Sequence, residues 1–214
     1  MKHLLFDLDG TLSDSGAGII HCGQETLAHF GMEVPSYDDL RPMVGPPLRD
    51  SLRHFGISEE NMEEAVEIYR QAYVDHGQYE NFPYPGIAQL LQKLHQDGHK
   101  LYVATSKPEI MAEHILQHFG LDSYFTIICG STLDSNRITK ADVIRHLMKQ
   151  LPSDGKIIMI GDTIYDIEGA NELSLPSIGV SWGYGNLEEM RTAGAIGIAD
   201  SMDSLYEMIS NLED

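Results

Sequence analysis

The stretch Leu4-Leu5-Phe6-Asp7-Leu8-Asp9-Gly10-Thr11-Leu12 is a short apolar run that ends in two acids. Successive side chains of a strand point to opposite faces, so Asp7 and Asp9 share one face where the strand ends and Gly10 begins a loop. Like charges this close are unfavourable unless a cation neutralises them or one carboxylate holds a proton. Mg²⁺ is the abundant hard dication that prefers a few oxygen ligands plus water. The pair therefore indicates a bound metal, a shared proton, or both.

The composition is that of one acidic domain. A length of 214 residues is enough for one core with a modest insertion. The formal net charge of -19 argues against binding to nucleic-acid polymers and to anionic membrane surfaces. Cys22 and Cys129 follow no metal-binding or Cys-x-x-Cys spacing, which favours a reducing compartment, and no apolar run reaches membrane-spanning length. We therefore expect a cytoplasmic enzyme, and the sequence leaves its oligomeric state open.

A long region with helical periodicity follows the first strand. We expect that strand at residues 3–9 and three or four short helices between about Ser15 and Gln78, where apolar residues recur at helical spacing. Gly45-Pro46-Pro47 interrupts the pattern and predicts a rigid turn. The pattern predicts an all-α insertion at residues 15–81, with short flexible junctions near Asp14-Ser15-Gly16 and Asn81-Phe82-Pro83.

The remaining chain alternates helices with buried strands. The expected helices cover residues 86–97, 108–119, 139–150, 164–173 and 202–212, and the expected strands cover 100–105, 125–129, 156–161 and 176–180. Such alternation is typical of a doubly wound α/β domain with a mainly parallel sheet. The core would comprise residues 1–14 and 82–214.

Polar residues follow the expected strands. In doubly wound sheets, ligands bind outside the carboxyl ends of the strands, so polar residues at those ends are candidates for function. Thr105-Ser106-Lys107 ends the second strand, and its hydroxyls and backbone amides suit a phosphate. Lys140 lies near the start of a later helix, and Gly161-Asp162-Thr163-Ile164-Tyr165-Asp166 places Asp162 and Asp166 where they could join the first acidic pair.

This ordered set of motifs resembles the haloacid dehalogenase superfamily, specifically its phosphatases with a helical cap inserted after the first strand. The resemblance implies that Asp7 is the nucleophile, Asp9 the general acid and base, and Thr105 and Lys140 the phosphate binders. Lys107 or Arg137 could replace Lys140 as the phosphate partner, and Lys107 is otherwise expected to be solvent-exposed or a secondary contact. Magnesium and Lys140 would neutralise the repulsion between the nucleophile and the phosphate.

The resemblance also implies a metal site and a substrate site. Asp7, Asp9 through its backbone carbonyl, and Asp162 would bind Mg²⁺, and Asp166 would be a ligand or would support one. The expected substrate is a small phosphorylated metabolite, whose binding residues are Gly10, Thr105, Ser106, Lys140, Gly45 and Arg49. In the cap, Arg49 could meet a substrate anion. No histidine is assigned a catalytic role.

Several stretches are similar to a nucleotidase-like and phosphoglycolate-phosphatase-like branch of the superfamily. They are the loop at Gly45-Pro46-Pro47, Tyr84-Pro85-Gly86-Ile87, Ala104-Thr105-Ser106-Lys107-Pro108 and Gly130-Ser131-Thr132-Leu133-Asp134. Nucleoside monophosphates, phosphoglycolate and small sugar phosphates all remain open as substrates, because discrimination depends on a few cap contacts.

The sequence leaves two alternatives to a phosphatase open and argues against two others. Asp9 argues against a dehalogenase, since a halide leaving group needs no proton, and the absence of lysine between Asp14 and Gln92 argues against Schiff-base phosphonate chemistry. A sugar-phosphate mutase would need the same core residues. A catalytically idle binding or regulatory protein is the alternative outside enzymes, because a fold does not fix a function.

Overall fold

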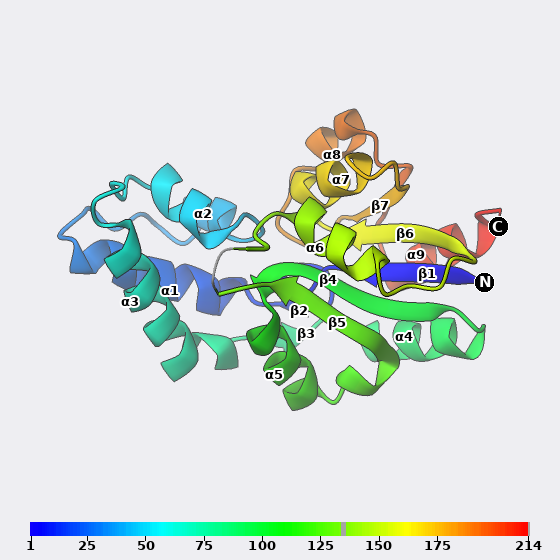
Figure 1. The fold of residues 1–214 in the computed structure, drawn as a ribbon. Coiled ribbons are helices and arrows are strands. Elements are labelled where there is room, and N and C mark those ends of the chain that lie inside the picture. Colours follow the sequence, from blue (N-terminus) through cyan, green and yellow to red (C-terminus); the bar gives the residue numbers. More distant parts are fainter. Residues whose placement is uncertain (134–135, 214) are drawn as a thin grey trace.

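The structure, a computed structural model, describes residues 1–133 and 136–213, so Asp134 and Ser135 lie outside the described residues. Within these residues the main sheet has six strands in the order β5-β4-β1-β6-β7-β8, and each neighbouring pair is parallel (Figure 1). The strands are β1 (Lys2–Phe6), β4 (Lys100–Pro108), β5 (Phe125–Ser131), β6 (Lys156–Gly161), β7 (Ser177–Val180) and β8 (Gly197–Ala199). The chain runs outward from β1 on one side and then returns to its other side, which confirms the predicted doubly wound α/β fold.

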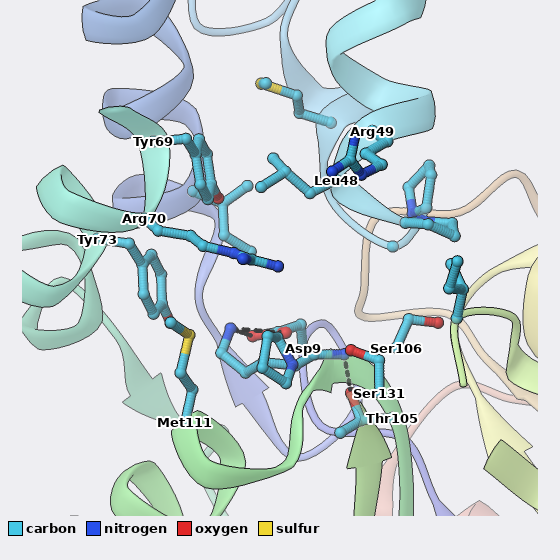
Figure 2. Close-up of a pocket in the computed structure, with 18 of the residues that line it drawn as sticks. Asp9, Leu48, Arg49, Tyr69, Arg70, Tyr73, Thr105, Ser106, Met111 and Ser131 are labelled. Atoms are coloured by element: carbon cyan, nitrogen blue, oxygen red, sulfur yellow. Dashed lines mark hydrogen bonds and ion pairs between the residues drawn. The ribbon is translucent and has the colours of Figure 1, made fainter. Parts of the chain in front are cut away.

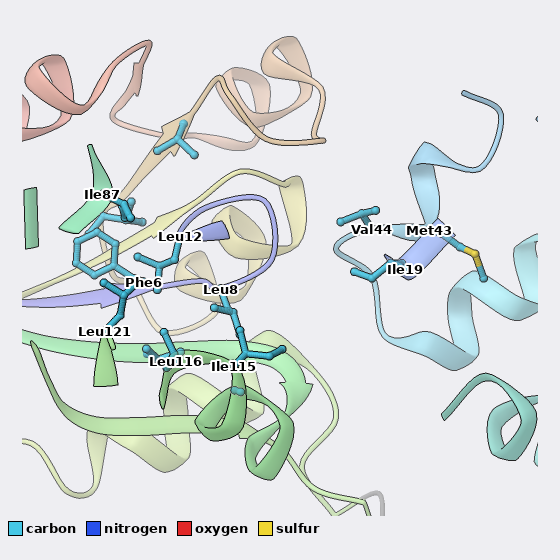
Figure 3. Close-up of a cluster of buried hydrophobic side chains, with 14 of the residues drawn as sticks. Phe6, Leu8, Leu12, Ile19, Met43, Val44, Ile87, Ile115, Leu116 and Leu121 are labelled. Carbon is cyan, nitrogen blue, oxygen red and sulfur yellow. The ribbon is translucent and has the colours of Figure 1, made fainter. Parts of the chain in front are cut away.

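The central strand β1 is buried along its whole length. Leu4 and Phe6 point into the larger apolar core, whereas Leu5 belongs to the smaller core on the other face of the sheet. A strand that is covered on both faces reads as a continuous apolar run, which explains the opening sequence. Figure 3 shows Phe6 in the larger core, where Ile115 and Leu116 also lie.

Helices cover both faces of the sheet (Figure 1). Apolar residues of α4 (Ile87–Gln96), α5 (Glu109–Phe119) and α9 (Met202–Asn211) fill the larger core. The smaller core is filled from α6 (Lys140–Met148) and α7 (Ile164–Asn171). Among the described residues, no helix is both long enough and apolar enough to cross a membrane.

A helical segment (residues 15–81) lies between two short strands that pair antiparallel, β2 (Ser13–Asp14) and β3 (Phe82–Pro83). Its elements are α1 (Gly16–His29), the 3-10 helix η1 (Arg41–Met43), α2 (Leu48–His54), α3 (Met62–Asp75) and the 3-10 helix η2 (Gly77–Tyr79). The expected turn lies between η1 and α2, where Gly45 has a φ of 112° that favours glycine. The domain boundaries at residues 14/15 and 81/82 stay a prediction.

The first strand is shorter than expected. β1 ends at Phe6, although the Asp7 amide still donates to the Ile160 carbonyl oxygen at 2.9 Å. The amides of Leu12 and Ser13 then donate back to the Leu8 carbonyl oxygen, so the chain turns immediately after the strand. Asp7 and Asp9 therefore lie on the loop beyond β1 and not on the strand itself.

The sheet continues beyond the last expected strand. The sequence indicated neither α8 (Leu187–Ala193) nor β8, which lie between the expected strand at 176–180 and the closing helix. Both elements are too short to establish a clear period, and the three residues of β8 begin with glycine. The Asn186 side chain accepts hydrogen bonds from the amides of Glu188 and Glu189 and caps the start of α8.

Candidate active site

The candidate site lies at the carboxyl ends of β1, β4 and β6. Asp7 follows β1, Thr105 lies near the end of β4, and Asp162 follows β6. Lys140 is the first residue of α6, whose start is fixed by a capping box between Thr139 and Asp142. Parallel strands end at one edge of a sheet, so the fold gathers these side chains from distant parts of the sequence.

Lys140 joins two buried carboxylates. Its Nζ lies 2.8 Å from Asp7 Oδ1 and 2.8 Å from Asp166 Oδ1, and it donates to the Ala104 carbonyl oxygen at 3.0 Å. An ammonium has three donors, and these acceptors match that number. Burial opposes the charge on Lys140, but Asp166 and Asp7 outweigh it and raise the Lys140 pKa. Lys140 is therefore a fixed positive charge beside Asp7.

Asp162 is held by groups on both sides of it. The Thr11 hydroxyl donates to Oδ1 at 3.0 Å, and the Tyr184 amide donates to Oδ2 at 2.8 Å. Gly10 has a φ of 80°, and a Cβ built there would lie 2.2 Å from Asp162 Oδ2. The loop after β1 thus needs glycine at position 10 for both its conformation and its close approach to Asp162.

Burial makes these acids hard to ionise. It raises the pKa of Asp7 to about 7, with Lys140 opposing the shift and the charges of Asp166 and Asp9 adding to it. Burial also raises the pKa of Asp162 well above its usual range, as do the charges of Asp166 and Asp7. Carboxylates that repel one another in this way are stabilised by a bound cation.

The donor set suits a hard divalent metal. One oxygen from each of Asp7, Asp162 and Asp166 lies within 4.8 Å of the others. Carboxylate oxygens are ligands that Mg²⁺ prefers. Asp166 is already engaged, because its Oδ2 accepts from the Thr163 amide and hydroxyl at 3.0 Å each and its Oδ1 contacts Lys140. The residues fit Mg²⁺. Asp7 and Asp162 are better placed than Asp166 to bind it, because both oxygens of Asp166 already contact other groups.

Lys107 contacts Asp9. Of the two expectations for Lys107, exposure to solvent is wrong, because its side chain is buried in a contact. Its side chain is only 6% exposed, and Nζ donates to both Asp9 carboxylate oxygens, at 2.8 and 2.9 Å. The Tyr73 ring of the helical segment lies 4.5 Å from the same ammonium. Burial opposes the charge, but Asp9 and Tyr73 outweigh it and raise the Lys107 pKa. This contact could not be predicted from the sequence, because 98 residues separate Lys107 from Asp9.

The loop at the end of β4 offers donors to a phosphate. Thr105 is buried, and its hydroxyl oxygen accepts from the Lys107 amide at 3.2 Å. The Ser106 hydroxyl is buried without a hydrogen-bond partner among the described residues. Arg137 is committed elsewhere, since it donates to the Gly130 carbonyl oxygen and to Glu109, each at 2.6 Å. Lys140, and not Arg137, is therefore the cation placed beside Asp7.

A pocket of about 130 Å³ separates these residues from the helical segment. Gly45, Arg49 and Arg70 line it together with Asp7, Asp9, Thr105 and Ser106. Arg49 is paired with Glu63 at 2.7 Å. Figure 2 shows Arg70 extending into the space between the helical segment and Asp9.

Arg70 was missed by the sequence analysis. Burial lowers its pKa, as does the neighbouring charge of Arg49. It stands on α3 beside Val66, Tyr69 and Tyr73, which also line the pocket. The sequence feature that could have indicated Arg70 is a basic residue on an otherwise apolar and aromatic helix face.

The chain resembles known proteins along nearly its whole length. The model of the family described as haloacid dehalogenase-like hydrolase matches residues 4–180. A predicted phosphatase from Clostridium acetobutylicum has a crystal structure with a TM-score of 0.94 and 43% identity, covering 99% of each chain.

Curated relatives carry different functional names. A 5'-nucleotidase from Pseudomonas aeruginosa is 42% identical over 88% of this chain and 86% of its own length. A phosphoglycolate phosphatase from Agrobacterium fabrum is 37% identical over 84% of this chain and 80% of its own length. The tyrosine-protein kinase PtkA from Mycobacterium tuberculosis is 38% identical over 96% of this chain and 72% of its own length.

Proposed function

The chain belongs to the haloacid dehalogenase-like hydrolase family, and we propose that it hydrolyses small phosphomonoesters through a covalent phosphate ester of Asp7. Its class is phosphatase, in agreement with relatives that carry phosphatase and nucleotidase names. One observation carries the proposal. Asp7, fixed beside the Lys140 ammonium at 2.8 Å, lines a pocket that residues of the helical segment border on its other side.

The proposed metal is Mg²⁺, held by Asp7, Asp162 and the backbone carbonyl of Asp9. When bound, it supplies positive charge that neutralises the phosphate oxygens next to the nucleophile. Asp166 is proposed to support the site, because its oxygens hold Lys140 and the Thr163 cap. Gly10, Thr105 and Ser106 are proposed to bind the phosphate, and Lys140, whose three donors are engaged, is proposed to bind it through its positive charge.

The first chemical step is attack by Asp7 on phosphorus. The Leu8 amide and Lys140 both contact Oδ1 of Asp7, at 2.7 and 2.8 Å, so Oδ2 is the proposed attacking oxygen. As the new O–P bond forms, the bond from phosphorus to the substrate oxygen breaks, and Asp9 gives that oxygen its proton. The leaving alcohol departs neutral, and Asp7 carries the phosphoryl group.

The second step returns the enzyme to its starting state. Asp9, now ionised, takes a proton from a water that attacks the same phosphorus, and the bond to Asp7 breaks. Lys107, at 2.8–2.9 Å from both oxygens, holds the Asp9 carboxylate in place.

The helical segment is proposed to act as a cap that selects the leaving group. Its pocket face combines the arginines at positions 49 and 70 with tyrosine rings, which suits a compact substrate with a second polar or anionic group. The names of the relatives support phosphoglycolate or a nucleoside 5'-monophosphate as the substrate type. A cytoplasmic location is part of this proposal.

Phosphate release from a panel of esters tests the proposal. The panel contains phosphoglycolate, nucleoside monophosphates and sugar phosphates, each with and without Mg²⁺. We expect Mg²⁺-dependent release by the native chain and none by Asp7→Asn. Conversion of a sugar phosphate to its isomer without phosphate release would instead indicate a mutase, and inactivity on every ester would refute the hydrolase.

A further inference from the structure

A cluster of histidine and glutamate side chains lies at the base of the helical segment. His21 and Glu25 stand one turn apart on α1, while His76 and Glu80 flank η2. One nitrogen of each histidine and one Glu25 oxygen lie within 4.8 Å of one another. Other residues line the pocket above Asp9, so the proposed hydrolysis does not account for this cluster.

The imidazole rings stand between the carboxylates in a regular way. The Nε2 atoms face Glu25, at 3.6 Å for His21 and 3.2 Å for His76. The Nδ1 atoms face Glu80 Oε1, at 3.1 Å for His21 and 3.6 Å for His76. The ring centroids are 5.2 Å apart. Each carboxylate therefore meets the same ring position of both histidines.

Two carboxylates beside two imidazoles form a site that a cation can occupy. A neutral imidazole carries hydrogen on only one of its nitrogens, so it can donate to only one of the carboxylates beside it. The hydrogen-bonded contacts are His21 Nδ1 with Glu80 at 3.1 Å and His76 Nε2 with Glu25 at 3.2 Å, whereas His21 Nε2 and His76 Nδ1 each lie 3.6 Å from a carboxylate oxygen. A metal ion between the two Nε2 atoms and Glu25 would form three coordinate bonds, and the hydrogen of the His76 ring would then lie on Nδ1, which faces Glu80.

The distances match one such ion. Ligand atoms bound at 2.0–2.1 Å around a tetrahedral Zn²⁺ lie about 3.3 Å apart. The separations of His76 Nε2 from Glu25 Oε2, 3.2 Å, and of His21 Nε2 from Glu25 Oε1, 3.6 Å, are close to this value, so each histidine faces its own oxygen of Glu25. Imidazole nitrogen is a zinc ligand, whereas Mg²⁺ prefers oxygen, so this cluster and the carboxylates near Asp7 select different metals.

We propose that His21, His76 and Glu25 bind Zn²⁺, with Glu80 accepting the Nδ1 hydrogen of His21 and facing Nδ1 of His76. A carboxylate behind a metal-bound imidazole fixes the tautomer and the ring orientation. The side chains of His21, Glu25 and His76 are 51%, 45% and 36% exposed, so water can complete the coordination and the ion can exchange with solvent.

The position of the cluster defines what the ion would do. The Gly18 amide of α1 donates to the Glu80 carbonyl oxygen at 3.3 Å, and a Cβ at Gly18 would lie 1.9 Å from the Gly77 carbonyl oxygen. These chain segments lead directly to β2 and β3, where the helical segment joins the core. Bound Zn²⁺ would therefore clamp the start and the end of the helical segment together.

Zn²⁺ binding to the full chain tests the proposal. The titration uses a competing chromophoric chelator and saturating Mg²⁺, which occupies the carboxylates near Asp7. His118→Gln serves as the background, because it removes the exposed His114–His118 pair on α5. In that background we expect one Zn²⁺ per chain and a higher unfolding temperature with Zn²⁺. Adding His21→Gln or His76→Gln should abolish both effects, and Glu80→Gln should weaken binding about 10- to 100-fold.

A matched control lies on the same helices. His29 Nε2 of α1 contacts Glu64 Oε1 of α3 at 3.4 Å, but this pair has a single histidine. His29→Gln should leave Zn²⁺ binding unchanged, and far-UV circular dichroism would check the fold of every variant.

Imidazole ¹H–¹⁵N spectra of the unsubstituted chain give a readout that needs no variant at positions 21 or 76. Zn²⁺ should shift the Nε2 signals of His21 and His76, with Nδ1 protonated. Absence of stoichiometric binding, unchanged binding in His21→Gln and His76→Gln, or an equal loss in His29→Gln would overturn the proposal.

Discussion

Replacing the proposed nucleophile should stabilise the metal-free protein at neutral pH. Asp7→Asn removes the buried carboxyl whose pKa burial raises from 3.8 to about 7, and keeps an oxygen that can accept from Lys140 and the Leu8 amide. A shift of about three pKa units corresponds to ~4 kcal/mol. After metal removal with a chelator, the free energy of unfolding of Asp7→Asn at pH 8 should exceed that of the native chain by up to ~4 kcal/mol.

The sign follows from the protons bound in each state. Below pH 4, Asp7 is neutral in both the folded and the unfolded chain, so the variant has no advantage. Between about pH 4 and pH 7 the unfolded chain loses this proton while the folded chain keeps it, so the native chain loses stability as pH rises. The advantage of Asp7→Asn should therefore grow across this interval and stay constant above it.

Urea unfolding at several pH values would measure the effect. The single tryptophan is a suitable fluorophore, because Trp182 Nε1 donates to the Thr11 carbonyl oxygen at 3.1 Å, next to the site. Asp38→Asn is the control, since Asp38 is exposed and its loss changes the net charge equally. Saturating Mg²⁺ should reduce or reverse the difference. An Asp7→Asn chain that is no more stable at pH 8 than at pH 4, relative to native, would refute the reasoning.

Further substitutions test separate contacts. Lys107→Met should lower the free energy of unfolding by about 3 kcal/mol in chemical denaturation, because Asp9 stays buried without its ammonium partner. An unchanged free energy of unfolding would contradict the ion pair. Arg70→Met should raise KM about tenfold or more for a phosphomonoester with a second anionic group and leave kcat nearly unchanged. A loss in kcat as large as the rise in KM would instead place Arg70 in the chemical step. Gly10→Ala should abolish phosphate release and lower the free energy of unfolding by at least about 2 kcal/mol. Gly31→Ala is the control, because Gly31 has a φ of 66° and open space around it, so this variant should lose only about 1 kcal/mol and keep activity. Equal effects of the two substitutions would mean that crowding against Asp162 is unimportant.

The residues that lie at the ends of the sheet's strands could be predicted from the sequence. Asp7, Thr105 and Asp162 each follow or end a buried strand, and parallel strands bring such ends together whatever their separation in sequence. Lys140 was placed by its position in the motif order, and its contact with Asp7 fits that expectation. The roles of these residues in catalysis stay predictions.

Contacts between the helical segment and the core could not be predicted in the same way. Lys107 follows a strand end, where a lysine is usually solvated, and only the fold shows that Asp9 and Tyr73 bury it. Arg70 depends on how α3 is rotated toward the pocket.

The histidine cluster was hidden for a similar reason. His21 and Glu25 form one His-x-x-x-Glu pair, and His76 and Glu80 form another about 50 residues later. In the sequence alone, each pair has the spacing of an ordinary contact on the surface of a helix. Only the packing of α1 against the end of α3 and η2 brings the pairs together.

The central claim is that Asp7 carries the phosphoryl group, and trapping that intermediate tests it most directly. The chain is mixed with p-nitrophenyl phosphate and Mg²⁺, quenched during turnover, and treated with borohydride, which reduces an acyl phosphate to an alcohol. Mass spectrometry of the digested protein should locate the reduced side chain at position 7. Phosphate release with the modification at another residue, or with unmodified Asp7 throughout turnover, would contradict the account.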